Sequence, residues 1–146
     1  MKKALKRRFE KGQHIYVVDY WYTFNGPQAF ETSSIIWKVN KKDRTFLASL
    51  YGDTFKTYSF NDYNRLFFDT LDDAAKAASK LPKPQTTVYH VIDNIIYTKL
   101  VIGIYGRYTN DTYDLFIELN NGNNISTKEI GITLFLTESD AIKNKK

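Results

Sequence analysis

Apolar and aromatic side chains alternate with polar ones along most of the 146-residue chain, which predicts β-strands more than amphipathic helices. Asn, Gly, Pro and charged residues separate the alternating segments and mark the turns. In the first half the expected strands are His14–Phe24, Phe30–Asn40, Arg44–Tyr51, Phe55–Phe60 and Leu66–Phe68. In the second half they are Thr86–Ile92, Ile95–Tyr108, Thr112–Leu119, Asn124–Lys128 and Ile132–Leu136.

The alternation gives way to helical sequence twice, each time directly after a short strand. One predicted helix is the alanine-rich segment Leu71–Lys80, and the other is Glu138–Lys145. Thr70 and Thr137 stand just before them, where a threonine hydroxyl can accept from a free N–H of the first helical turn. We therefore predict that both threonines are helix N-caps.

The local sequence around these caps occurs twice. Residues 66–76 read LFFDTLDDAAK and residues 133–143 read TLFLTESDAIK. The alignment pairs Phe68 with Phe135, Thr70 with Thr137, Asp73 with Asp140, Ala74 with Ala141 and Lys76 with Lys143. A similar strand opens each half, at Ile15–Val18 and at Val88–Ile92. A spacing of roughly 70 residues is typical of two small domains or two halves of one fold, because solenoid repeats are shorter.

These observations predict a mainly β (α+β) protein with two tandem copies of a five-stranded SH3-like small barrel, each followed by one short C-terminal helix. The expected divisions are a basic N-terminal arm (1–12), a first barrel and helix (13–81), a proline-containing linker (82–85) and a second barrel and helix (86–146). A half of this size is marginally stable alone, so we expect the halves to pack together. The alternative architecture is a single sheet that continues across both halves.

The N-terminal arm is distinguished by its positive charge. Residues 1–12 hold six basic side chains against Glu10, and so account for the whole net charge of +5. The basic residues are Lys2, Lys3, Lys6, Arg7, Arg8 and Lys11. We predict that the arm binds phosphates and contributes to partner affinity, and that folding does not need it. The alternatives are a solubilising, frayed terminus or a first amphipathic turn that packs Leu5 and Phe9 on the body of the protein.

Catalytic chemistry has little support in the sequence. The chain has no cysteine, which excludes thiolate nucleophiles, disulfides and cysteine-ligated metal sites. His14 and His90 are the two histidines, and neither has a serine or carboxylate at a recognisable catalytic spacing. We therefore expect no enzyme activity, no catalytic residue, no metal site and no cofactor.

A candidate binding face lies on the long expected strand of the second half. The face assigned to the core carries Ile96, Leu100, Ile102 and Ile104. The alternation of a strand then turns outward the candidate binding residues Tyr97, Lys99, Tyr105 and Arg107. Tyrosine and arginine offer large contact area with a polar group, and are favoured at binding sites. The alternative is that the first half packs on this face.

An aromatic run in the first long strand, Tyr20–Phe24, places rings on both faces of that strand. Either both faces are buried, one in the core and one between the halves, or one face presents rings to a partner. The sequence leaves both interpretations open.

The unit of a barrel and a helix that ends in F-L-T-x-x-x-A resembles a recurrent, largely uncharacterised group of small proteins from phages, prophages and other mobile elements of Gram-positive bacteria. The resemblance is strongest over Thr87–Lys143, through VYHVIDNIIYTKLVIGIYG, IGITLFLT and SDAIK. The first half departs from it, with FFDT in place of FLT and a longer insert around Asn25–Ala29. The resemblance implies a setting in which small non-enzymatic proteins bind host machinery.

Together these features lead to two functional hypotheses. The first is a non-catalytic binding protein of a phage or mobile element that acts on a host protein or nucleoprotein complex, for example as an inhibitor of a defence nuclease. The alternative is a nucleic-acid-binding module that uses the basic arm and the aromatic faces. We expect it in the bacterial cytoplasm, because no segment is apolar enough to span a membrane and no apolar segment follows the basic N-terminus.

Overall fold

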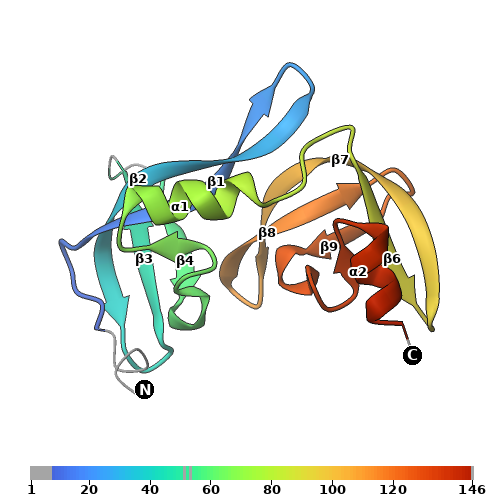
Figure 1. Ribbon diagram of the computed structural model, residues 1–146. Coiled ribbons are helices and arrows are strands. Elements are labelled where there is room, and N and C mark those ends of the chain that lie inside the picture. The colour runs from blue at the N-terminus through green and yellow to red at the C-terminus, as the bar shows by residue number, and fades with distance from the viewer. Residues whose placement is uncertain (1–7, 51, 53, 146) are drawn as a thin grey trace.

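The computed structural model describes residues 8–50, 52 and 54–145 (Figure 1). Strands, a short 3-10 turn and a helix follow one another in the same order twice. The first half contains β1 (His14–Thr23), β2 (Gly26–Asn40), β3 (Thr45–Ser49), β4 (Lys56–Ser59), η2 (Phe60–Asp62), β5 (Phe67–Phe68) and α1 (Leu71–Ser79). The second half contains β6 (Thr87–Ile92), β7 (Ile95–Thr109), β8 (Thr112–Leu119), β9 (Asn124–Ser126), η3 (Thr127–Glu129), β10 (Leu134–Phe135) and α2 (Glu138–Lys143).

The two halves have the same strand order. The first sheet runs β4-β3-β2-β1-β5, and the second runs β9-β8-β7-β6-β10, all antiparallel. One of the two sheets is a half-barrel. The predicted mainly β fold, with five strands and then a short helix in each half, is confirmed. The single continuous sheet is wrong, because no described strand of one half pairs with a strand of the other.

The helix caps confirm the sequence repeat at single residues. The Thr70 hydroxyl oxygen accepts from the Asp73 N–H at 3.1 Å, and the Thr137 oxygen accepts from the Asp140 N–H at 3.2 Å. Neither helix within the described ranges is long and apolar enough to cross a membrane.

Both long strands also contain a β-bulge at the same place in the repeat. In β2 the register shifts between Ile36 and Lys38, so Trp37 is the extra residue. In β7 it shifts between Val101 and Gly103, with one extra residue between them. A bulge reverses which face the following residues occupy.

The bulge corrects the predicted alternation along β7. Of the four isoleucine and leucine residues assigned to one core face, Ile96, Leu100 and Ile102 are half-buried and Ile104 is fully buried. Val101, which a regular alternation places on the opposite face, is also fully buried. The buried residues therefore change from an odd-numbered position before the bulge, Val101, to an even-numbered position after it, Ile104. A regular alternation does not describe this strand.

The first half differs from the second by a longer β1–β2 hairpin. Pairing aligns Asp19 and Phe30 with Ile92 and Ile95, so residues 20–29 replace a two-residue turn. This first-half extension is the upper blue hairpin in Figure 1, and its turn lies against the linker and β7.

The second half differs from the first by a longer β7–β8 hairpin. Pairing aligns Tyr105 and Phe116 with Asn40 and Thr45, so residues 106–115 replace a four-residue turn. This second-half extension lies beside β4 of the first half.

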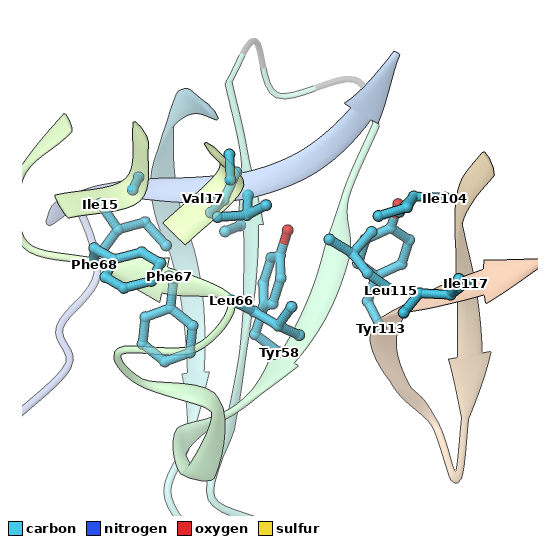
Figure 2. Packing of buried hydrophobic residues seen from close by; sticks show 14 of the residues in the cluster. Ile15, Val17, Tyr58, Leu66, Phe67, Phe68, Ile104, Tyr113, Leu115 and Ile117 are labelled. Atoms are coloured by element: carbon cyan, nitrogen blue, oxygen red, sulfur yellow. The ribbon is translucent and has the colours of Figure 1, made fainter. Parts of the chain in front are cut away.

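One buried cluster joins the halves. Figure 2 shows side chains of both, such as Tyr58 and Leu66 of the first half and Leu115 of the second, in the same cluster. The rings of Tyr58 and Tyr113 are 5.9 Å apart. The expectation that the halves pack together is confirmed.

The last part of the predicted arm belongs to this core. Phe9 is buried, and its ring lies 5.0 Å from Phe60, 5.4 Å from Phe67 and 5.5 Å from Phe46. These contacts contradict the prediction that residues 1–12 are dispensable for folding, and they support the alternative for Phe9. Leu5 lies outside the described residues.

The predicted linker, residues 82–85, is packed as well. Pro82 and Pro84 are buried, and a Cβ placed on Gly26 would lie 3.3 Å from the Pro84 Cβ. The connection between the halves therefore lies against the turn of the β1–β2 hairpin.

Candidate binding surfaces

The second-half extension is docked on the first half through Tyr113. The Tyr113 hydroxyl donates to Asp19 Oδ1 at 2.6 Å, and the Lys56 ammonium donates to Asp19 Oδ2 at 2.7 Å. Lys56 Nζ also lies 5.0 Å from the centre of the Tyr113 ring. Burial, and secondly the Asp19 carboxylate, raises the pKa of the Tyr113 phenol, so this hydroxyl stays a donor.

Arg65 makes a second polar bridge between the halves. Its guanidinium donates at 2.8 Å to Asp62 of its own half and to Asp114 of the second-half extension, and at 2.7 Å to Thr127. The Ser126 hydroxyl donates to the other Asp114 oxygen at 2.6 Å. Asp62 and Asp114 are buried, so Arg65 compensates two carboxylates that water cannot reach freely. The second-half extension is therefore docked on the first half through Tyr113 and Asp114, whereas its residues 107–111 remain exposed.

The four residues of the predicted binding face do not share a face. The bulge puts Tyr97 and Lys99 on the side of Val101, whereas Tyr105 and Arg107 lie on the opposite side of the strand. Tyr97 is 41% exposed, and Lys99 Nζ lies 5.4 Å from its ring centre.

Tyr105 and Arg107 also lie close to other residues. Tyr105 is half-buried, with its ring 5.8 Å from Tyr20 and 6.4 Å from Tyr22 of the first-half extension. The Arg107 guanidinium lies 5.5 Å from the Phe116 ring centre. The first half thus covers part of this side of β7, as the alternative interpretation expected.

The predicted basic arm is described only at its end. Lys2, Lys3, Lys6 and Arg7 lie outside the described residues, whereas Arg8 and Lys11 line an open groove of about 1040 Å³ on the first half. The same groove is lined by Trp37 and by further basic residues, namely Lys38, Lys41 and Arg44. We call this site the basic groove.

The basic groove contains residues that the sequence interpretation missed. Residues 38–44 read KVNKKDR, with four basic side chains against one acidic, and the alternation pattern predicts only the end of a strand and a charged turn there. The overall charge balance of residues 13–146 hid this local excess. A short window of charge along the chain would have found it.

The first-half extension carries the most exposed aromatic residues of the described chain. Trp21 is 66% exposed, Tyr22 is 63% exposed and Phe24 is fully exposed. The aromatic run therefore combines both interpretations. Tyr20 packs against Tyr105 of the second half, whereas Trp21, Tyr22 and Phe24 present rings to solvent.

The tip of this extension is held in one conformation by local contacts. The Thr23 hydroxyl donates to the Gly26 carbonyl at 2.7 Å and accepts from the Asn25 N–H at 3.3 Å. Pro27 is buried against Gly103 of β7, where a Cβ on the glycine would lie 2.5 Å from the proline ring. The exposed rings therefore stand on a hairpin whose β2 strand is braced against β7 next to the turn.

His90 is the histidine in the more buried environment. Its Nδ1 atom is buried and has no hydrogen-bond partner. Burial, and secondly the nearby Lys99, lowers the pKa of His90. No three histidine or acidic residues among those described are placed to hold a metal ion.

Comparisons with protein families, with curated proteins and with solved structures found no match to this chain.

Proposed function

We propose that the chain is a non-catalytic binding protein of a phage or mobile element, and that it docks on a host protein through the first-half extension. Inhibition of a defence nuclease is one activity that such docking would serve. As the structural basis we propose two tandem SH3-like barrels, of which the first acquired this hairpin. The identical strand order, the equivalent helix caps and the shared bulge support that proposal.

The observation that carries the proposed function is the exposed aromatic tip. Trp21, Tyr22 and Phe24 expose a large apolar area on a segment that the second half replaces with a two-residue turn. A fold that is complete without such a tip has no structural use for three exposed rings. Tryptophan and tyrosine are the residues that most often dominate the energy of protein–protein interfaces.

The rigidity of the extension supports the same conclusion. The hydrogen bonds of Thr23 and the packing of Pro27 on Gly103 hold the rings before any partner binds. A preorganised binding element loses less conformational entropy when it binds than a flexible one. The best-fitting partner is a protein with an apolar pocket that accepts one or two rings.

The test is affinity capture from a host lysate with the wild-type chain and with a Trp21→Ala/Phe24→Ala variant, each with and without nuclease treatment. We expect the wild type to retain a partner after nuclease treatment, and the variant to lose it. A matched control is Ile132→Ala/Ile142→Ala, which removes two exposed apolar side chains of the second half and should retain the partner.

The identified partner then allows a quantitative test. Each single variant, Trp21→Ala or Phe24→Ala, should weaken binding by more than about 1 kcal/mol and change the unfolding free energy by less than about 0.5 kcal/mol. A partner that disappears on nuclease treatment, or that binds the double variant as well as the wild type, would contradict the proposal.

A further inference from the structure

We propose that the basic groove binds single-stranded nucleic acid, with basic side chains on the phosphates and Trp37 as a stacking surface for a base. The site lies on the β2–β3 side of the first half, and none of its lining residues belongs to the first-half extension. It therefore adds a second binding activity to the proposed protein docking, and either can fail without the other.

Charge is the first argument. Five of the residues that line the groove are basic, and Glu10 is the acidic one among them. Lys11, Lys38 and Lys41 form no ion pair with any other residue in the described ranges. Lysines that have no acidic partner and gather in one groove attract a polyanion, since binding releases counterions from its phosphates.

The position of Trp37 is the second argument. Trp37 is the extra residue of the β2 bulge, and bulges redirect side chains away from the regular strand. Its indole N–H donates to the Ser49 carbonyl at 3.3 Å, and its ring meets Phe55 edge-on at 5.8 Å. A Cβ on Gly52 would lie 3.0 Å from the same ring. The indole is thus held in place on these sides, yet 43% of Trp37 stays exposed at the groove.

A fixed and exposed aromatic ring among cations favours the binding of single-stranded nucleic acid over other polyanions. Bases of a single strand are free to stack on an aromatic side chain, and every base offers a π-face. Bases of a duplex are already stacked, and neither the carboxylates of an acidic peptide nor a lipid phosphate brings an aromatic ring with each charge. The combination therefore favours single-stranded DNA or RNA.

The first test measures binding of a short fluorescent oligothymidylate by anisotropy. Trp37→Ala should weaken binding about tenfold, from the usual contribution of one base stack. The matched control is Trp21→Ala, which removes the other tryptophan from the first-half extension and should leave this affinity unchanged. A duplex of the same length should bind at least about tenfold more weakly than the single strand.

A second test addresses the cations. Lys38→Gln/Lys41→Gln should reduce the slope of log affinity against log salt concentration by about 1.4, because each phosphate that is no longer neutralised lowers this slope by about 0.7. The matched control, Lys80→Gln/Lys83→Gln, removes two exposed lysines at the end of α1 and in the linker, and should keep the wild-type slope.

A third measurement does not disturb the groove. Trp21→Phe leaves Trp37 as the single tryptophan of the chain, and the oligonucleotide should then quench its fluorescence. Equal affinity for duplex and single strand, unchanged binding by Trp37→Ala with an unchanged melting temperature, or binding without quenching would each overturn the proposal.

Discussion

The two hairpin extensions differ in what they do with their aromatic residues, although each is added to an equivalent scaffold. In the second-half extension, Tyr113 is buried and donates to Asp19 of the other half. In the first-half extension, Trp21 and Phe24 remain in solvent. Both insertions pack on the other half, but the second-half extension buries its tyrosine there. The first-half extension packs through Pro27 and leaves the rings near its turn exposed.

This difference shows how to recognise a functional surface in a repeated fold. Residues that occupy equivalent positions in both halves, such as the helix caps, serve the scaffold. Residues present in one half alone serve either the contact between the halves or something outside the molecule. Tyr113 and Asp114 make the contact between the halves, and we propose the second role for the exposed Trp21, Tyr22 and Phe24.

The first prediction tests the contact that docks the second-half extension on the first half. Arg65→Met leaves the buried carboxylates of Asp62 and Asp114 without their cation, so we expect a loss of about 3–5 kcal/mol in the free energy of unfolding. Urea unfolding measures it. The control Lys76→Met removes the exposed helical pair with Asp72, which is 3.5 Å long, and should cost no more than about 0.5 kcal/mol. Similar losses in both variants would contradict the role of Arg65.

The second prediction compares a buried phenylalanine, Phe9, with an exposed one in the same half. Phe9→Ala removes a buried ring from an aromatic cluster and should cost about 3 kcal/mol or more. The control is Phe24→Ala, whose ring is fully exposed and whose removal should cost less than about 0.5 kcal/mol. Thermal unfolding of both variants compares a buried phenylalanine with a free one. If Phe9→Ala melts like the wild type, residues 8–12 are not part of the folded core.

The equivalent caps should give equal, smaller effects. Thr70→Ala and Thr137→Ala each remove the acceptor for an N–H of the first helical turn, and each should cost about 1 kcal/mol. Denaturant unfolding measures both, with Ser139→Ala inside α2 as a control that removes no cap. A loss in one half alone would show that the two helices are not equivalent.

The smallest expected effect is the pH dependence of stability that comes from His90 in the second half. Because burial lowers its pKa from 6.5 in the folded chain, the unfolded chain takes up the proton more readily. Its contribution to stability is therefore complete above pH 6.5 and decreases as the pH falls toward the lowered pKa. Unfolding of wild type and His90→Gln at neutral and mildly acidic pH should show a smaller pH dependence in the variant. An NMR titration midpoint of His90 at or above 6.5 would refute this prediction.

Much of the fold follows from local sequence patterns. Strands, turns and helix caps depend on residues a few positions apart, so alternation, turn residues and the threonines at 70 and 137 were sufficient to predict them. The repeat of F-x-T-x-x-D-A also indicated the two halves. The glycines at 103 and 106 predict a bend or bulge in the long strand of the second half, and the structure has one between Val101 and Gly103. The bulge of β2 was not predicted, because Trp37 looks like an ordinary strand residue until the neighbouring strand sets the register.

The sequence by itself determined the elements, their order and the excess of basic and aromatic side chains. Only the tertiary structure decided which of these side chains are free. Tyr113 and Asp19 are 94 positions apart, and Lys11 and Lys41 meet in one groove only because the chain after Phe9 packs beside β2 and β3. Contacts between distant residues depend on the packing of the whole chain, and no local pattern records whether a ring or a lysine has acquired a partner there.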